Sequence, residues 1–313
     1  SYAREALLNG LSFEDQGMKN PFEFGFVGAS DTHTAAIGDD ESDFYGKLGL
    51  TDATPQQTGA VPLSAEEGER LLESAPDSVR EFEAGVYANG DDITFGASGI
   101  TGVWAEDNTR ESIYSAFRRK ETFATTGTRI KVRFFGGYDF TDETLTAPDL
   151  LETAYSDGVS MGSDLLPNGD RAPRFIVWAT QDALSAPLQR LQIIKGWTVD
   201  GEPHEQVFDV ACSDNLAVDP QTHRCGDNGA QVNLADCSIS AEVVAAELKT
   251  VWVDPEFDPS VRAFYYSRVL ENPTCRWSTW DALKEGYEPR PDFPTTIQER
   301  AYTSPIWFRP STG

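Results

Sequence analysis

The chain has 313 residues, enough for two domains with hydrophobic cores of their own. Its 51 acidic and 25 basic residues give a formal net charge of −26, and this negative field disfavours nucleic acids and anionic membranes as partners. No run of about twenty apolar residues is present, so no transmembrane segment is predicted. The acidity suits salty water, where ions screen self-repulsion. A marine or halophilic source is one interpretation, and an ordinary acidic bacterial protein is the other.

The N-terminal stretch predicts an amphipathic helix over residues 2–16, because Leu7, Leu8 and Leu11 share one helical face. It has no basic-then-apolar signal pattern. Residues 35–62 are polar and lack periodicity, which is typical of a long loop. Ser64 then begins a second helix that we expect to run to about Ser74.

Between these helices lies a short apolar run, from Phe24 to Ala29, that predicts a buried strand. Asp31 and His33 follow its end, and in an extended chain two such side chains leave on the same side. A carboxylate and an imidazole at the end of a barrel strand can hold a divalent metal. The alternative is an aspartate that caps a turn beside a surface histidine.

A helix is predicted over residues 109–120, with Asn108 and Glu111 as a capping box. Ile113, Ala116 and Phe117 are expected to face inward. Just before and within its first turn lie Glu106 and Arg110, the predicted catalytic pair. Arg110 could bind a substrate oxyanion and Glu106 could orient it or assist proton transfer. In the other interpretation both are surface charges of the first turn.

After residue 128 the pattern changes to alternating, strand-like segments separated by Gly, Pro, Asp and Asn clusters. Several strands with few helices predict a β-sandwich over residues 129–313, following a first domain over residues 1–128. The expected strands lie at 130–135, 174–180, 188–195, 206–211, 248–253 and 261–270.

All four cysteines lie in the last third of the chain. An even number in one domain predicts two disulfides and an oxidising compartment, so we expect a periplasmic or extracellular protein. We expect Cys212 to pair with Cys225 and Cys237 with Cys275, although the spacing leaves three connectivities open. Four reduced, buried thiols are the alternative.

Ser30-Asp31-Thr32-His33 resembles the last metal-binding motif of the PHP (polymerase and histidinol phosphatase) hydrolases. A longer resemblance covers nearly the whole chain and is to an uncharacterised bacterial family, domain-of-unknown-function family 3604, which is considered PHP-like. The segments that carry this resemblance are 20–33, 99–106, 114–127, 262–280 and 298–307.

The resemblance implies the C-terminal part of a PHP-like distorted β/α barrel, followed by the β-sandwich. It implies two or three divalent transition metals (Zn, Mn or Fe), with Asp31 and His33 as two of the ligands. Metal-activated water would then hydrolyse an anionic substrate, small or polymeric, by default a phosphoester. Relatives carry a His-x-His motif upstream, so the N-terminal part of the same protein is the expected partner that completes the site.

A non-catalytic extracellular protein that binds glycans or polymers is the alternative. Its tryptophans would stack on sugars, whereas in the simpler interpretation they belong to the sandwich core. The six tryptophans considered for this role, of seven in the chain, are Trp178, Trp197, Trp252, Trp277, Trp280 and Trp307.

Overall fold

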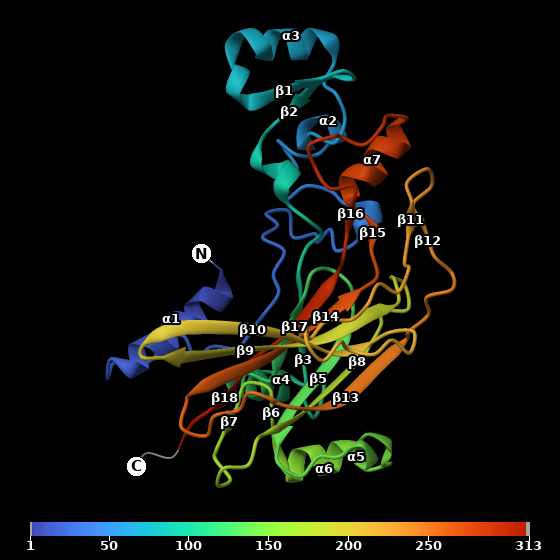
Figure 1. Cartoon of the computed structure of the whole chain (residues 1–313). Coiled ribbons are helices and arrows are strands. Elements are labelled where there is room, and N and C mark those ends of the chain that lie inside the picture. The colour runs from blue at the N-terminus through green and yellow to red at the C-terminus, as the bar shows by residue number, and fades with distance from the viewer. Residues whose placement is uncertain (1, 311–313) are drawn as a thin grey trace.

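The structure, a computed structural model, describes residues 2–310. Two β-sheets pack face to face, short helices cover their outer surfaces, and an arm projects from one end of this sandwich (Figure 1). The fold is therefore mixed α/β. Within the described residues no sheet closes into a barrel, so the barrel portion predicted for residues 1–128 is not found there.

The larger sheet contains eight strands, and all but one of its pairings are antiparallel. Its strands are β3 (Ile100–Val103), β4 (Thr122–Thr125), β7 (Asp164–Leu165), β9 (Leu188–Val199), β10 (Glu202–Cys212), β14 (Ala263–Glu271), β17 (Arg300–Thr303) and β18 (Ile306–Phe308). The main order is β10-β9-β14-β17-β4-β3, while β18 joins β14 to β7. Because β4 pairs with β17, the sheet continues across the boundary predicted near residue 128.

The smaller sheet has the order β13-β8-β5-β6, and every pairing in it is antiparallel. Its strands are β5 (Lys131–Gly137), β6 (Gly158–Ser160), β8 (Arg174–Thr180) and β13 (Glu247–Val253). The alternating pattern predicts six strands. They correspond to β5, β8 and β13 of this sheet and to β9, β10 and β14 of the larger sheet, so these strand predictions are confirmed.

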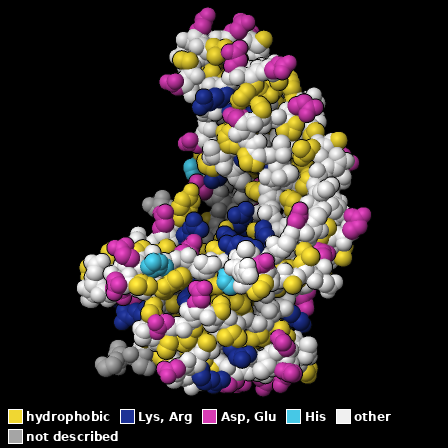
Figure 2. Space-filling model, viewed as in Figure 1, with side chains coloured by type: hydrophobic (Ala, Val, Ile, Leu, Met, Phe, Trp, Pro, Cys, Tyr) yellow, Lys and Arg dark blue, Asp and Glu magenta, His cyan; other side chains and the backbone are white. Residues whose placement is uncertain are grey.

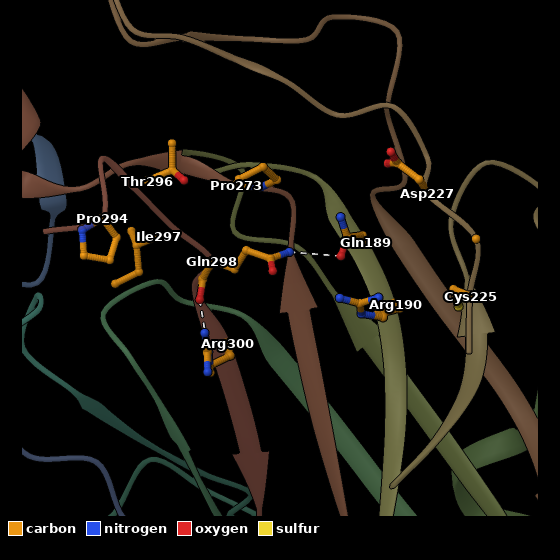
Figure 3. A pocket seen from close by; sticks show the side chains of 11 residues that line it. Gln189, Arg190, Cys225, Asp227, Pro273, Pro294, Thr296, Ile297, Gln298 and Arg300 are labelled. Carbon is orange, nitrogen blue, oxygen red and sulfur yellow. Dashed lines mark hydrogen bonds between the residues drawn. The ribbon is translucent and has the colours of Figure 1, made fainter. Parts of the chain in front are cut away.

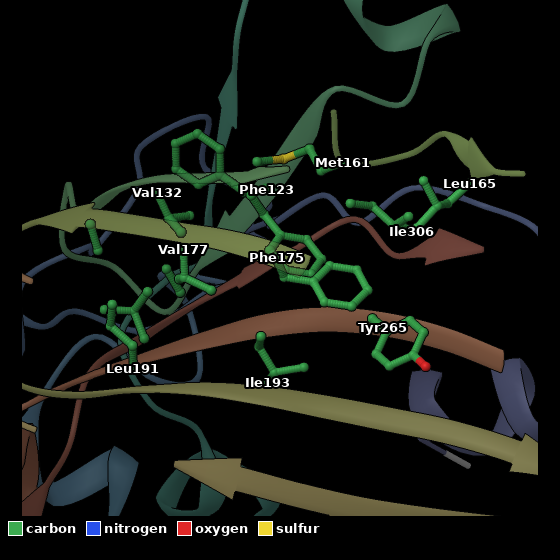
Figure 4. Packing of buried hydrophobic residues seen from close by; sticks show 14 of the residues in the cluster. Phe123, Val132, Met161, Leu165, Phe175, Val177, Leu191, Ile193, Tyr265 and Ile306 are labelled. Carbon is green, nitrogen blue, oxygen red and sulfur yellow. The ribbon is translucent and has the colours of Figure 1, made fainter. Parts of the chain in front are cut away.

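The main core lies between the two sheets (Figure 4). Phe175 and Val177 of β8 point toward Ile193 of β9 and Tyr265 of β14, and the rings of Phe175 and Tyr265 are 4.5 Å apart. Side chains alternate between the faces of a strand, so the neighbours of Tyr265, Phe264 and Tyr266, point to the opposite face.

The outer faces of both sheets are covered. On the larger sheet, α1 (Ala3–Asp15) packs Leu7 and Leu11, one helical turn apart, against Phe264 and Tyr266, which confirms the predicted N-terminal helix. On the smaller sheet, α5 (Asp142–Thr146) and α6 (Leu150–Ser156) bury apolar side chains in the same way (Figure 1).

Residues 22–32 form no strand, so the buried strand predicted there is wrong. Phe24 and Phe26 instead pack on the outer face of the larger sheet, which explains why this segment is apolar without being a sheet member. Gly28 lies so close to Ile100 that a Cβ atom on it would meet the Ile100 carbonyl oxygen at 2.3 Å. The segment is therefore fixed against the edge strand β3.

The helix after β3 is α4 (Arg110–Arg118), and two details of its prediction are wrong. Thr109, rather than Asn108, is the N-cap, and its hydroxyl accepts a hydrogen bond from the Ser112 backbone NH. Phe117 is exposed instead of facing inward. Only one side of this helix contacts the sheet, so an apolar side chain on its edge remains in solvent.

The arm combines segments from both parts of the chain around Trp277, which is fully buried against Phe44. Arg290 is also buried, and its guanidinium donates to the carbonyl oxygens of Gly59 and Ala88. The arm contains η1 (Glu41–Asp43), α2 (Pro55–Thr58), α3 (Ala65–Ser74), η2 (Pro76–Ser78), β1 (Val79–Phe82), β2 (Gly85–Ala88), η3 (Asp91–Thr94), β15 (Thr274–Cys275), α7 (Trp277–Glu285) and β16 (Thr296–Ile297). The helix predicted after Ser64 is thus confirmed as α3.

Both expected disulfides are present. Cys212 at the end of β10 is bonded to Cys225, and Cys237 is bonded to Cys275. The second bond ties the hairpin of β11 (Val232–Asn233) and β12 (Ser238–Ile239) to β15 at the base of the arm. None of the helices in residues 2–310 combines the length and apolar character needed to cross a membrane.

Truncating Phe175 to alanine removes a ring from the centre of the main core, and we expect it to lower the free energy of unfolding by about 3–5 kcal/mol. Phe117→Ala is the matched control, because this ring is exposed, and its effect should stay within roughly 0.5 kcal/mol. Urea denaturation of both variants measures the difference. Equal effects would contradict the assignment of the core.

Replacing Cys237 and Cys275 together by serine opens a loop with a sequence separation of 38, and loop entropy then predicts a loss of about 4 kcal/mol. Replacing Cys212 and Cys225 opens a separation of 13 and should cost about 3 kcal/mol. Thermal unfolding of both double variants gives the order. A larger loss for the shorter loop would contradict the entropic account.

Candidate functional site

Asp31 and His33 lie together on the loop that follows the Phe24–Ala29 segment. The Oδ1 atom of Asp31 is 3.9 Å from Nε2 of His33, and their side chains are 76% and 62% exposed. Asp31 has a φ of +55°, in the left-handed region that aspartate tolerates better than most residues. A turn, rather than the predicted strand geometry, therefore brings the two side chains together.

Lys47 holds this loop in place. Its carbonyl oxygen accepts a hydrogen bond of 2.8 Å from the His33 backbone NH, and its ammonium lies 3.6 Å from Asp31 Oδ2. The same ammonium stacks 4.0 Å above the ring of Phe95. In this arrangement Lys47 balances the charge of Asp31, and a metal ion at Asp31 would compete with it.

The Asp31–His33 pair fits two ligands of a metal centre. A tetrahedral ion with bonds of about 2.0–2.1 Å holds its ligand atoms roughly 3.4 Å apart, and two exposed side chains can close the difference from 3.9 Å by small rotations. Within residues 2–310, however, no three His, Cys, Asp or Glu side chains are grouped so that they could hold an ion. The described residues therefore offer at most two ligands at this place.

Glu106 and Arg110 are both exposed, and no ion pair joins them in the described part of the chain. Glu106 lines an open pocket of about 440 Å³ that does not include Arg110. Segment 28–29 lies beside the start of β3, whereas Glu106 follows its end. The structure therefore places the two predicted pairs at opposite ends of β3, and the roles of Glu106 and Arg110 stay predictions.

The pocket beside Glu106 contains a polar network that the sequence analysis missed. Glu121 is buried and accepts hydrogen bonds from the hydroxyls of Tyr155 and Ser160. Arg133 donates to the Tyr155 hydroxyl and stacks 3.7 Å from the Trp104 ring. Each of these polar groups has a hydrogen-bond partner within the protein, so a structural role accounts for the network without a ligand.

Two buried glutamates, Glu271 and Glu299, lie near the base of the arm. Ser185 donates to Oε2 of Glu271 at 2.6 Å, and Thr126 donates to Oε2 of Glu299. The other oxygen of each carboxyl has no hydrogen-bond partner in residues 2–310. Burial raises the pKa of Glu271 to about 7, and burial together with the charge of Glu41 raises the pKa of Glu299 to about 8.

Lys and Arg side chains gather in a hollow between the arm and the sandwich, whereas acidic side chains are spread over the remainder of the same face (Figure 2). Arg190 and Arg300 line an open pocket of about 690 Å³ together with Gln189 and Gln298 (Figure 3). The sequence analysis did not single out these arginines. Neighbouring strands each contribute one such arginine, and this grouping becomes visible only once the strand order is known.

Comparison with known proteins gives one match. The family model described as "Protein of unknown function (DUF3604)" matches residues 1–310. No protein of curated function and no solved structure matches the chain.

The two buried carboxyls predict how stability depends on pH. Their pKa values are raised in the folded state, so the folded protein holds protons that the unfolded chain has lost, and stability falls as pH rises from about 4.5 toward 8. Glu299→Gln should therefore stabilise the protein at pH 8, by on the order of 1 kcal/mol or more, and have little effect near pH 4.5.

Thermal unfolding of wild type and variant across this pH range tests the assignment. Glu69→Gln, at an exposed position of α3, is the matched control and should leave the pH dependence unchanged. A Glu299→Gln protein that loses stability equally at both ends of the range would contradict the raised pKa.

Proposed function

We propose that this chain, which belongs to the DUF3604 family by its match over residues 1–310, is part of a PHP-like metal-dependent hydrolase that cleaves phosphoesters. The observation that carries the proposal is the convergence of Asp31 Oδ1 and His33 Nε2 at 3.9 Å on an exposed loop. A carboxylate and an imidazole are the ligand pair that zinc, manganese and iron accept.

In this proposal His33 binds the ion through Nε2 and Asp31 through Oδ1. A bound divalent ion would activate water and polarise the scissile phosphoryl oxygen. Lys47, whose ammonium lies 3.6 Å from Asp31 Oδ2, holds the Asp31 carboxylate in place until the ion displaces that ammonium. The remaining ligands of a centre with two or three ions come, in this proposal, from an N-terminal part of the same protein.

The compartment forms part of the proposal. Two disulfides are typical of proteins that fold in an oxidising environment, which supports a periplasmic or extracellular location. Zinc and manganese are the ions we propose for such a site, with iron as the third candidate.

The alternative of a glycan-binding protein draws no support from its tryptophans. Trp277 and Trp307 are buried, and no tryptophan in residues 2–310 is exposed. Stacking on a sugar requires an open indole face, so these side chains are explained better as packing. We also assign Glu106 and Arg110 no part in the chemistry at Asp31, because they lie at the far end of β3.

The test is metal content of the full natural gene product, measured by elemental analysis after loading with zinc or manganese and dialysis. We expect two or three bound ions in wild type, loss of at least one in Asp31→Ala, and loss of hydrolysis of an aryl phosphate in that variant. Asp77→Ala, which removes an exposed aspartate of the arm, should retain both properties. Metal content that is unchanged in Asp31→Ala would refute the role of this loop.

A further inference from the structure

We propose that Arg190, Arg268 and Arg300 form a binding site for a tetrahedral oxyanion ester, a phosphate or sulfate monoester, on the outer face of the larger sheet. The binding itself is independent of the metal site. Only the further statement that this anion is the substrate of the hydrolase rests on the proposed function.

The three arginines share one face by strand alternation. On β14, Tyr265 and Val269 point into the main core while Tyr266 points outward, so Arg268 also points outward. On β17, Ala301 belongs to the main core, so Arg300 lies on the outer face. The same alternation places Arg190 outward, next to the core residue Leu191 on β9.

The register places them side by side. Leu270 of β14 pairs with Arg190 on one side and with Arg300 on the other. Arg268 lies two residues before Leu270, on the next outward position of the same strand. Strands in a sheet are about 4.8 Å apart, so Arg190 and Arg300 have backbones roughly 10 Å apart, and their long side chains can meet over Leu270.

The guanidinium groups are poorly paired. Arg190 Nε is buried and has no hydrogen-bond partner in the described residues, and the nearest carboxylate contact of Arg190 is 3.8 Å, to Asp209. Arg300 donates through Nε to the Gln298 carbonyl oxygen, and Arg268 donates through Nε to the Gln192 side chain. Within residues 2–310 neither of these two arginines forms a salt bridge.

The local charge is positive in a chain with a net charge of −26. Asp209 is the one buried carboxylate on this face in the described chain, and it already accepts from Gln192 at 2.6 Å and from the Cys225 backbone NH at 2.7 Å. Asp227 is exposed at the pocket edge, where its carboxylate accepts from the Gly229 backbone NH. Arg224, 3.8 Å from Asp209, adds a fourth positive charge.

The carboxyls beneath this face do not cancel the positive charge in mildly acidic solution. Glu271 and Glu299 belong to the buried layer, and their raised pKa values of about 7 and about 8 keep them largely protonated in mildly acidic solution. Guanidinium groups on one sheet face repel one another, and in this proposal an anion that bridges them removes this repulsion while satisfying the unpaired Nε of Arg190.

The lining of the pocket indicates the class of ligand. Guanidinium groups are forked donors that match the oxygens of phosphate and sulfate, and the amides of Gln189 and Gln298 add neutral donors and acceptors (Figure 3). The open volume of about 690 Å³ leaves room for an organic group attached to the ester oxygen. The pocket is open to solvent, so a polymeric ester can extend out of it.

The experiment is calorimetric titration of the metal-free protein, in EDTA at fixed ionic strength, with phenyl phosphate and with phenyl sulfate. We expect saturable binding of at least one ester by wild type, about tenfold weaker binding by Arg300→Gln and by Arg190→Gln, and no measurable binding by the double variant. Arg300→Lys keeps the positive charge but loses the paired, bidentate donors of the guanidinium, so its affinity should lie between those of wild type and Arg300→Gln.

Comparing the two esters shows whether the site prefers a phosphate or a sulfate group. A phosphate monoester gains its second charge near pH 6, so its binding should strengthen from pH 5 to pH 7.5, whereas a sulfate ester keeps one charge throughout. Tighter binding of phenyl phosphate at pH 7.5 assigns a phosphoester site. Equal or tighter binding of phenyl sulfate assigns a sulfate-ester site.

The controls separate this inference from the proposed function. Arg80→Gln removes an exposed arginine of the arm and should bind as wild type does, and Asp31→Ala should also bind normally because no metal takes part. Circular dichroism checks that each variant is folded. Wild-type affinity in a folded Arg190→Gln/Arg300→Gln protein, or no ester binding by wild type, overturns the anion site, whatever the metal analysis shows.

Discussion

Burial of the larger sheet on both faces is the constraint on which the other features depend. Its central strand β14 sends Tyr265 and Val269 into the main core and Phe264 and Tyr266 toward α1. A one-residue slip would exchange these two sets, so the register is strongly specified. The same register fixes which side chains reach the outer face where α1 does not cover it, and there the outward positions of β9, β14 and β17 carry arginine.

Charges are distributed unevenly over the protein, and the hollow between the arm and the sandwich is locally positive. The chain has a net charge of −26, while Lys and Arg side chains gather in the hollow between the arm and the sandwich (Figure 2). The buried residues Trp277 and Arg290 hold the segments of the arm together, and the Cys237–Cys275 bond ties its base to the β11–β12 hairpin.

The loop that carries Asp31 and His33 lies near the β3 edge of the larger sheet, and the arginines lie on strands of the same sheet. Segment 24–29 packs on the outer face and along β3, and it delivers Asp31 and His33 to the edge of the sheet. From β3 the sheet continues through β4 and β17 to the arginines. In the proposed function, a substrate held by its oxyanion would have the proposed ligands Asp31 and His33 at the edge of the same sheet, where the Lys47 ammonium lies 3.6 Å from Asp31.

The sequence by itself determined the elements whose pattern repeats over many residues. These are the alternating strands, the helices after Tyr2 and Ser64, and the confinement of four cysteines to one region. It also pointed to Asp31 and His33, because two such residues so close in sequence are near one another in most conformations. Only the tertiary structure decided that Phe24–Ala29 lies on a sheet instead of within it, since an apolar run reads the same in either place. It also decided the grouping of Arg190, Arg268 and Arg300, because strand order and register join residues that are far apart in the sequence, and no local pattern encodes this grouping.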